Sequence, residues 1–526
     1  MCSEDRLDRV AERLTRFCRV LAAILFGYVA LFALIETSVF KKGEEVFEIV
    51  EYSRDSILWS VLLLAAFLLI AWLCRRLGRF WKNVPTWTAY AALALIAVAA
   101  GTYWVWLVQS IPYADSEEVF LAAKGAAVGD YTAFLRTDDY YAGMNYFSVY
   151  PFQLGYVFLT EPLFRLFPDG NAVVTELFNV ATLAALYLGL QRLAHLLFGR
   201  KTLWILTALL IGCVQPVFFC GFPYGILPGF AAGVWATVFT VKMMQRDDRR
   251  RYWLLLPICV LLAYGVLAKY NTMIFVIAVS LGLAVDFIRK RQYWWLFSIV
   301  AIVALPVLSM KAIIALYAWR AGTYFGAGVG QLQYLCAGMR NSDMAPGWYN
   351  QWSKIIYCDA RGDTAVANRV ALDSLKNRMA EFAHDLPMAR RFFQQKILSQ
   401  WNEPSFESLW VTQVKFHYNG DPIGLLYSIY SGAGRKILDV WMHFYHLLTF
   451  SLFAVGMAVP MKKKSTETLV PVLVMLGGFA YHLLFEAKSQ YLMTYFALMT
   501  VFAAYTLARI GDKADRIDEK RKDCTK

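Results

Sequence analysis

An aspartate stands directly after a long apolar run and opens a stretch of charged residues. Asp115 follows the run that ends near residue 110, in the sequence IPYADSEEVF. A carboxylate held at a membrane surface can accept the proton of an acceptor hydroxyl while that hydroxyl attacks an anomeric carbon, a general-base contribution of roughly 10² to 10⁴ in rate. The alternative is an acid on a solvated loop. The charged side chains that accompany it are Glu117, Glu118, Arg136, Asp138 and Asp139.

Two short polar sites place a lysine at the end of an apolar run. A leaving phosphate gains negative charge as a sugar–phosphate bond breaks, so a preorganised lysine nearby would stabilise that transition state. The alternative is that these long side chains only mark the membrane interface by extending toward water. The sites are LAKYNT, with Lys269, Tyr270 and Asn271, and FEAKSQY, with Glu486, Lys488, Gln490 and Tyr491.

Two aromatic segments further along the chain could hold a sugar ring. PGWYNQW spans 346–352 and KILSQWNEPSFESLW spans 396–410. Trp348 and Trp401 stand there beside polar side chains such as Glu403. Such rings can stack on sugars, but they also fill small cores or anchor a domain at the membrane interface. Both interpretations stay open at this point.

The composition indicates that lipid is the solvent of most of the chain. Of 526 residues, 59% are hydrophobic and 17% are charged, against roughly 25% charged in ordinary soluble domains. The net charge of +13 comes from short basic clusters between apolar runs, a pattern typical of topology signals and not of a nucleic-acid surface. The nine cysteines show no zinc-type spacing. We therefore expect no nucleic-acid partner and no cofactor, with a divalent metal left open.

Apolar runs near the ~20 residues that cross a bilayer recur along the chain. They predict an all-α polytopic membrane protein with about 12 transmembrane helices and an uncleaved first helix. The expected spans are 18–38, 56–74, 88–110, 172–197, 202–219, 224–243, 252–268, 271–288, 293–318, 437–460, 467–485 and 490–509.

Every second connection between these runs is basic, and Lys and Arg in short loops mark the cytoplasmic side. This pattern predicts a multi-pass protein of the cell membrane with both termini in the cytoplasm. It divides the chain into transmembrane helices with a catalytic outer loop at 111–171 (1–318), a small, mainly helical extracytoplasmic domain (319–436), and final helices with a basic tail (437–526). The basic residues are Arg75, Arg76, Arg79 and Lys82; Arg200 and Lys201; Arg246, Arg249, Arg250 and Arg251; Arg289, Lys290 and Arg291; and Lys462, Lys463 and Lys464.

Three details of the outer side add to this prediction. The run 151–167 is apolar but contains Glu161 and Arg165, each costing about 2.5–3.5 kcal/mol at a helix centre, so an interfacial helix is expected. The turn CGFPYGILPG is irregular and needs cover from protein or water. Cys336 and Cys358 are the only cysteines expected outside, and whether they form a disulfide stays open.

The order of these sites resembles that of bacterial GT-C glycosyltransferases, in particular family 39 and protein-mannosyltransferase-like membrane enzymes. The resemblance covers about residues 105 to 510. It is carried by Asp115, the stretch YFSVYPFQLG with Tyr150, TELFNVATLAALYL, the Tyr-Gly pair at Tyr224 and Gly225, LAKYNT, GWYN, QWNEP and FEAKSQY.

The resemblance implies a GT-C-type fold with its chemistry at the outer face and an inverting single displacement. Asp115 would be the general base, and Lys269, Lys488 and Arg136 would face the phosphate. The implied partners are a polyprenyl-phosphate sugar donor, membrane lipid, and a cell-envelope glycan acceptor such as a polysaccharide, a teichoic-type polymer or a lipid-linked glycan. The sequence departs from the family pattern in its additional N-terminal helix pair and in the Ser-Glu-Glu that follows Asp115.

Two other functions suit the same topology. A transporter or flippase of a lipid-linked or envelope precursor also needs about a dozen helices, but it should carry charges near the bilayer centre and often inverted repeats. A ligase that uses a preassembled lipid-linked glycan would share the outer-face geometry. The clustering of polar residues at the outer side favours a sugar-transferring enzyme.

Overall fold

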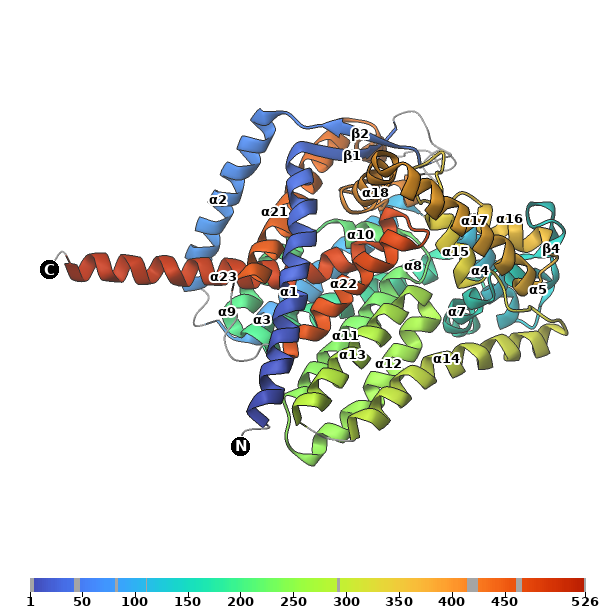
Figure 1. Ribbon diagram of the computed structural model, residues 1–526, viewed down its shortest axis with the longest axis horizontal. Coiled ribbons are helices and arrows are strands. Elements are labelled where there is room, and N and C mark those ends of the chain that lie inside the picture. The colour runs from blue at the N-terminus through green and yellow to red at the C-terminus, as the bar shows by residue number, and fades with distance from the viewer. Residues whose placement is uncertain are drawn as a thin grey trace.

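The computed structural model describes residues 4–41, 48–80, 84–109, 111–290, 294–413, 424–459 and 466–524. Within them the regular structure is helical apart from two short antiparallel hairpins, β1–β2 and β3–β4. Long helices form a bundle, and shorter helices gather at one end of it (Figure 1). The two ends of the chain lie away from those shorter helices (Figure 1). The predicted all-α polytopic membrane fold is therefore confirmed.

The long helices match the predicted spans. Among the described residues, ten helices are long and apolar enough to cross a membrane. The span expected at 202–219 is instead a pair of helices, Arg200–Gly212 and Gln215–Gly221, bent by 55°. The long helices are α1 (Glu4–Ile35), α2 (Ile57–Phe80), α3 (Thr86–Val108), α8 (Ala172–Phe198), α9 (Arg200–Gly212), α11 (Ile226–Met244), α12 (Leu255–Ala268), α13 (Met273–Lys290), α14 (Trp294–Ala321), α21 (Ala433–Ala458), α22 (Leu469–Leu484) and α23 (Met493–Cys524).

The span expected at 56–74 corresponds to α2, whose described apolar stretch, Val61–Leu73, is shorter than a membrane span. Some of the residues used to predict topology, Lys82, Arg291 and Lys462 to Lys464, lie outside the described residues. Short 3-10 helices join several spans, and these are η4 (Phe219–Gly221), η5 (Arg249–Leu254), η6 (Tyr270–Thr272), η7 (Thr466–Thr468) and η8 (Ser489–Tyr491). The short helix α10 (Gln215–Phe218) precedes η4.

The segment 111–171 folds as a set of short elements beside the C-terminal end of α14. They are α4 (Asp115–Ala127), α5 (Thr132–Leu135), β3 (Thr137–Asp138), η2 (Asp139–Tyr141), β4 (Met144–Asn145), α6 (Tyr146–Val149), η3 (Pro151–Gln153) and α7 (Leu154–Leu166).

A buried ion-pair network joins this segment to α14. Both carboxylate oxygens of Glu161 accept hydrogen bonds from Arg320, at 2.8 and 2.9 Å, and Arg165 and Tyr317 donate to the same carboxylate. Arg320 also donates to the hydroxyl of Tyr131 at 2.7 Å. A buried charge is stable only when it is paired and hydrogen-bonded in this way. Glu161 therefore fixes α7 to α14.

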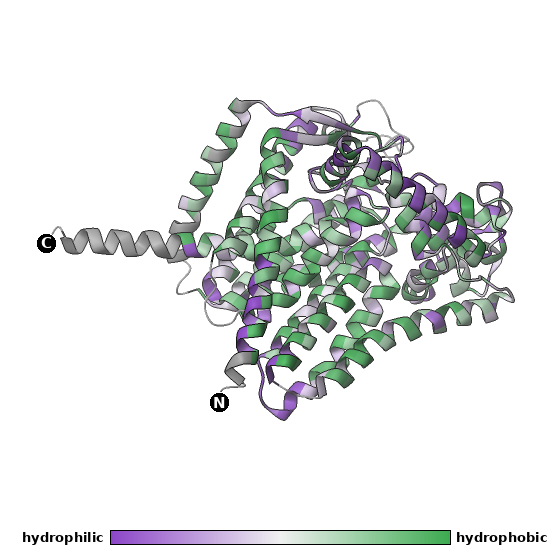
Figure 2. Cartoon of the chain, in the orientation of Figure 1, coloured by the Kyte–Doolittle hydropathy of each residue, from purple (hydrophilic) through white to green (hydrophobic). Residues whose placement is uncertain are grey.

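The described helices of 319–436, which keep here the name outer domain from their predicted location, form a polar layer at one end of the bundle, as their hydrophilic colouring shows (Figure 2). Cys336 and Cys358 are both buried free thiols, so they form no disulfide here. The hairpin of β1 (Glu36–Phe40) and β2 (Val50–Arg54) pairs Glu36 with Arg54 and lies close to α18 (Figure 1). The helices of the domain are α15 (Gln331–Gly338), α16 (Trp352–Asp359), α17 (Thr364–His384), α18 (Leu386–Trp401) and α20 (Leu425–Tyr430).

Candidate active site

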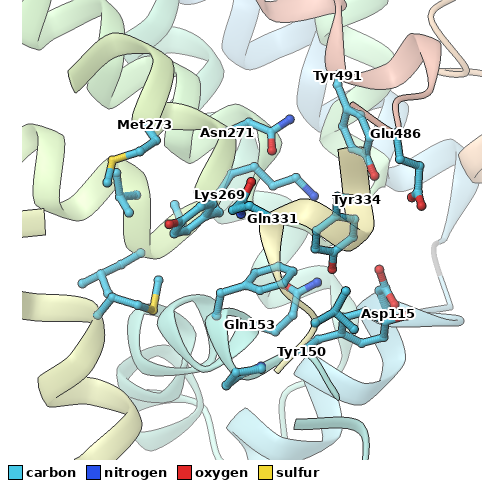
Figure 3. A pocket seen from close by; sticks show the side chains of 18 of the residues that line it. Asp115, Tyr150, Gln153, Lys269, Asn271, Met273, Gln331, Tyr334, Glu486 and Tyr491 are labelled. Carbon is cyan, nitrogen blue, oxygen red and sulfur yellow. The ribbon is translucent and has the colours of Figure 1, made fainter. Parts of the chain in front are cut away.

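A cavity of about 740 Å³ lies between the outer domain and the ends of the long helices. Its walls come from parts of the chain that are far apart in sequence. They are the start of α4, the stretch around η2 and η3, the residue pair before α11, the end of α12 with η6, the middle of α14, the start of α15 and the turn 486–491. Figure 3 places Asp115, Glu486 and Tyr334 at one side of the cavity and Met273 at the other.

Asp115 is the first residue of α4, where a helix favours negative charge. Its side chain is exposed to the cavity. The preceding residue, Ala114, has φ +49° and ψ −132°, a strained conformation for a residue with a Cβ. Ser116 stabilises this turn, since its hydroxyl accepts from the backbone N–H of Tyr113 at 3.0 Å and donates to the carbonyl of Tyr113 at 2.8 Å.

Tyr224 holds one oxygen of the Asp115 carboxylate. The Tyr224 hydroxyl donates to Asp115 Oδ2 at 3.3 Å and accepts a hydrogen bond from the Gln153 amide. Oδ2 is therefore engaged by this hydrogen bond, while Asp115 also lines the cavity. The chain Gln153–Tyr224–Asp115 therefore orients a carboxylate toward the cavity.

Lys269 lies over the same tyrosine. Its Nζ is 4.0 Å from the ring centroid of Tyr224 and 5.0 Å from that of Tyr491, both within the range of cation–π attraction. Burial lowers the pKa of Lys269 to about 8, while the charge of Asp115 opposes that shift. In the part of the chain that the structure describes, no carboxylate is close enough to form an ion pair with this ammonium.

Glycine allows these groups to meet. A Cβ on Gly225 would stand 1.8 Å from the carbonyl oxygen of Ala268, so only glycine lets the start of α11 approach the end of α12. One turn further, a Cβ on Gly229 would be 3.0 Å from the Cβ of Lys269. The irregular turn CGFPYGILPG is buried, and its close contact brings Tyr224 against Lys269.

The turn 486–491 alternates between the cavity and a buried layer behind it. Glu486, Lys488 and Gln490 line the cavity. Burial raises the pKa of Glu486 to about 7, and the charge of Lys488 opposes that shift. Behind the turn, the buried hydroxyl of Ser489 lies 2.9 Å from Glu403 Oε2 and 3.2 Å from Glu407 Oε1.

Glu403 and Glu407 support this turn by accepting hydrogen bonds from it. Glu403 accepts hydrogen bonds from the Ser405 N–H and the Glu407 N–H, both at 2.8 Å, and from the Ser405 hydroxyl at 2.5 Å. Glu407 accepts from the Gln490 N–H at 3.2 Å. Burial raises the pKa of Glu407 to about 8, although Lys488 opposes the shift. The Ser489 hydroxyl has one proton and can donate it to only one of two carboxylates. A protonated Glu407 therefore leaves Glu403 as the acceptor of that proton.

A buried lysine completes the support. Lys396 Nζ donates to the carbonyls of Gly338 and Phe485, the latter at 2.9 Å, which are the ends of α15 and α22. Burial lowers the pKa of Lys396 to about 7. A Cβ on Gly338 would lie 2.2 Å from the backbone of Phe485. The outer domain thus holds the turn that carries Glu486 by hydrogen bonds from Lys396 and by close backbone packing at Gly338.

The structure brings most of the predicted site residues together. Their shared property is that they line one cavity, although they come from five separate segments. They are Asp115, Tyr150, Tyr224, Lys269, Tyr270, Asn271, Glu486, Lys488, Gln490 and Tyr491.

The remaining acidic candidates lie outside the cavity lining. Glu117 and Asp139 are exposed. Arg136 forms an ion pair with Glu118, so its charge is already partnered. Asp138 caps η2 by accepting a hydrogen bond from the Tyr140 N–H at 2.8 Å.

The tryptophan candidates are packing residues. Trp348 is 0% exposed, and its indole N–H donates to the hydroxyl of Ser399 at 2.9 Å. Trp401 is 1% exposed and packs between Phe26 and Phe479 at centroid distances of 5.0 and 5.7 Å. Glu403 is likewise buried behind the cavity wall. None of the three has a surface on which a sugar could lie.

Several cavity residues were not predicted from the sequence. Gln153 lies within the quoted stretch YFSVYPFQLG, and Lys311 within an apolar run, but neither stands out by spacing. The high tyrosine content of 30 residues is the one signal that could have pointed to the others. The tyrosines that also line the cavity are Tyr140, Tyr141, Tyr334, Tyr349 and Tyr481.

Comparison with known proteins gives matches among solved structures alone. No family model matches the chain, and no curated protein matches its sequence. The oligosaccharyltransferase of Archaeoglobus fulgidus in the apo form matches with a TM-score of 0.40 and 12% identity over 84% of this chain and 52% of that one. AglB of the same organism, in complex with an inhibitory peptide and a dolichol-phosphate, gives 0.38 and 12% over the same shares. The chain spans about half the length of these structures.

Glu407→Gln is expected to remove a pH-dependent loss of stability. The folded protein keeps the Glu407 proton up to about pH 8, whereas an exposed glutamate loses it near pH ~4.3. The folded state therefore binds more protons within this window, and its stability falls as the pH rises through it. Thermal unfolding of the purified protein across the window should show a decline in wild type that flattens in the variant.

Glu403→Gln is the matched control. Its amide nitrogen would face donors that now reach a carboxylate, so it should lower stability at every pH, by about 1–3 kcal/mol for each donor left without an acceptor. If Glu407→Gln behaved in the same way, Glu407 would be ionised in the folded protein.

Proposed function

We propose that this chain is a membrane glycosyltransferase of the GT-C type that transfers a sugar from a polyprenyl-phosphate donor to a glycan acceptor at the outer face of a bacterial cell membrane. The observation that carries the proposal is that Asp115 and Lys269 meet across Tyr224 inside one cavity. A base for the acceptor and a cation for the leaving group are the two parts that such a displacement needs.

The apolar half of the cavity supports a lipid-linked donor. Leu267, Met273, Pro306 and Met310 line it. Most of α14 is exposed, since only 22% of the residues in its most apolar stretch are buried. A prenyl chain lying here would stay in contact with the bilayer.

Two lysines line the cavity beside its apolar residues. A Cβ on Gly155 would be 2.9 Å from Leu267 Cα and 3.0 Å from the end of the Met310 side chain, so α7 packs closely against both α12 and α14 here. Lys269 and Lys311 follow Leu267 and Met310 by one or two residues and line the same cavity. In α14, ten residues separate Lys311 from Ala321, about 15 Å of helix, too far for its ammonium to reach the helix end.

The chemistry balances as a single displacement with inversion. The acceptor oxygen forms a bond to the anomeric carbon as the bond from that carbon to the phosphate oxygen breaks, and the electron pair leaves with the phosphate. The hydroxyl proton goes to Asp115. Lys269 stabilises the charge that grows on the phosphate, and Tyr224 keeps the carboxylate pointed at the acceptor.

The polar half of the cavity suits a saccharide acceptor. Tyr140 and Tyr349 form a pair there, with their hydroxyls 2.8 Å apart. Tyr141 and Tyr150 line the same side. Aromatic faces beside hydroxyl donors are typical of pockets that hold an amphipathic ligand in one orientation. A cell-envelope glycan, as a polysaccharide, teichoic-type polymer or lipid-linked glycan, has this character.

Asp115→Asn is expected to lower sugar transfer by about 10² to 10⁴, because the amide keeps the shape of the side chain but cannot accept the proton. The measurement is transfer of label from radiolabelled polyprenyl-phosphate sugars to envelope glycans by purified protein in lipid. Asp359→Asn, an exposed acid at the end of α16, is the control and should keep full activity. An active Asp115→Asn protein would remove this residue from the mechanism.

Tyr224→Phe is expected to lower the turnover rate by about tenfold or more, since it removes one charge-assisted hydrogen bond to Asp115. Tyr156→Phe is a matched control, because the Tyr156 side chain is buried next to Tyr224 but its hydroxyl has no hydrogen-bond partner among the described residues. The same transfer assay checks both. Equal effects of the two substitutions would mean that packing, not the hydrogen bond, is what Tyr224 contributes.

The orientation predicts which cysteine substitutions react with an impermeant thiol reagent in intact cells. Asp373→Cys, on the exposed side of α17, should be labelled directly, and Asp247→Cys, in the basic turn after α11, only after permeabilisation. Their side chains are 74% and 91% exposed, so both are accessible to reagent. The reverse pattern would place Asp115 in the cytoplasm and contradict the proposal.

A further inference from the structure

One of the three lysines that line the cavity among the described residues already has a partner. Lys488 Nζ lies 2.6 Å from Glu48 Oε1, and the two side chains are only 15% and 5% exposed. The pair joins residues 440 positions apart. At this distance and burial the two charges cancel as seen from the cavity.

Glu48 is held in place by the N-terminal hairpin. The backbone N–H of Ser38 donates to the Asn402 carbonyl at 3.1 Å, and the N–H of Val50 donates to the Met344 carbonyl at 2.9 Å. The Tyr52 hydroxyl donates to the Gln395 carbonyl at 3.0 Å. The hairpin is thus hydrogen-bonded to the outer domain at Met344, Gln395 and Asn402. It connects α1 and α2, the helix pair that precedes the Asp115 loop.

No other nearby acid does the same work. Among the described residues, Glu48 is the acid that lies within ion-pair distance of Lys488, and burial raises the pKa of Glu407 to about 8. Glu486 lies on the same turn, where burial raises its pKa to about 7. Burial alone would lower the pKa of Lys488, but the carboxylate of Glu48 outweighs that effect and the pKa is raised, so Lys488 keeps its charge. Glu48 is therefore the group that neutralises it.

We propose that Glu48 is a positioning residue that commits Lys488 to an ion pair and leaves Lys269 as the cation of this pair that meets the donor phosphate. The inference rests on the proposed function. It assigns a catalytic consequence to the N-terminal hairpin, because without Glu48 the free charge of Lys488 would be added to those of Lys269 and Lys311, which line the same cavity.

The charge of the lipid explains why this matters. A sugar-linked phosphodiester carries one negative charge, and the phosphate left after transfer gains a second. An extra free lysine would therefore bind the product more tightly than the substrate and slow its release. By pairing with Lys488, Glu48 keeps this extra positive charge away from the phosphate, so that the charge of the site suits the singly charged donor.

The test measures binding of geranylgeranyl phosphate to the purified full chain by calorimetry, with geranylgeraniol as the probe that lacks the phosphate. Lys269→Met should weaken binding by about tenfold or more, the scale of one charge-assisted contact, and Lys488→Met by less than about threefold. In the Glu48→Gln background, binding should tighten, and Lys488→Met should now weaken it by about tenfold. Glu48→Asp should restore the wild-type pattern.

Two results would overturn the inference. One is that Lys488→Met weakens binding in wild type as much as Lys269→Met does, and the other is that Glu48→Gln leaves Lys488 without influence on binding. A thermal-unfolding cycle over Glu48→Gln and Lys488→Met confirms that each variant folds. If wild type bound the phosphate and the alcohol equally, the proposed function would fail and not only the role of Glu48.

Discussion

The structure depends on holding one carboxylate and one ammonium beside each other, partly out of water, where the helix bundle meets the outer domain. Asp115 and Lys269 are separated by the ring of Tyr224, which donates a hydrogen bond to one and offers its face to the other. Charges at the edge of a membrane are costly unless neighbours compensate them. The surrounding elements are arranged so that these two are compensated without being neutralised by direct contact.

Close backbone contacts make this arrangement rigid. Gly225 lets α11 approach the carbonyl of Ala268, and Gly338 lets α15 meet the turn after α22. Lys396 then ties the ends of α15 and α22 together, and Glu403 seats Ser489. Each contact serves the position of a residue in the cavity wall. The displacement reaction proposed above would require such precision, since small misplacements of reacting groups cost large factors in rate.

The sequence predicted much of the fold and part of the site. Apolar runs of span length gave all the long helices, and the polar ends of those runs pointed to Asp115, Lys269 and the turn at Glu486. It could not distinguish Trp401, which is buried among Phe26 and Phe479, from an aromatic side chain in a sugar site. It also did not show that the helix at 202–219 is broken, because the two halves are apolar enough for one span when they are taken together.

What the sequence by itself determined is what short-range hydropathy and charge control: the membrane as solvent, the helical class and the approximate spans. Only the tertiary structure decided which charges are free. Glu48 forms an ion pair with Lys488, 440 positions away in sequence, and Glu118 forms one with Arg136. Lys269 instead lies over two aromatic rings. Pairing depends on distances of a few ångströms between segments that folding brings together, and no local pattern in the chain encodes those distances.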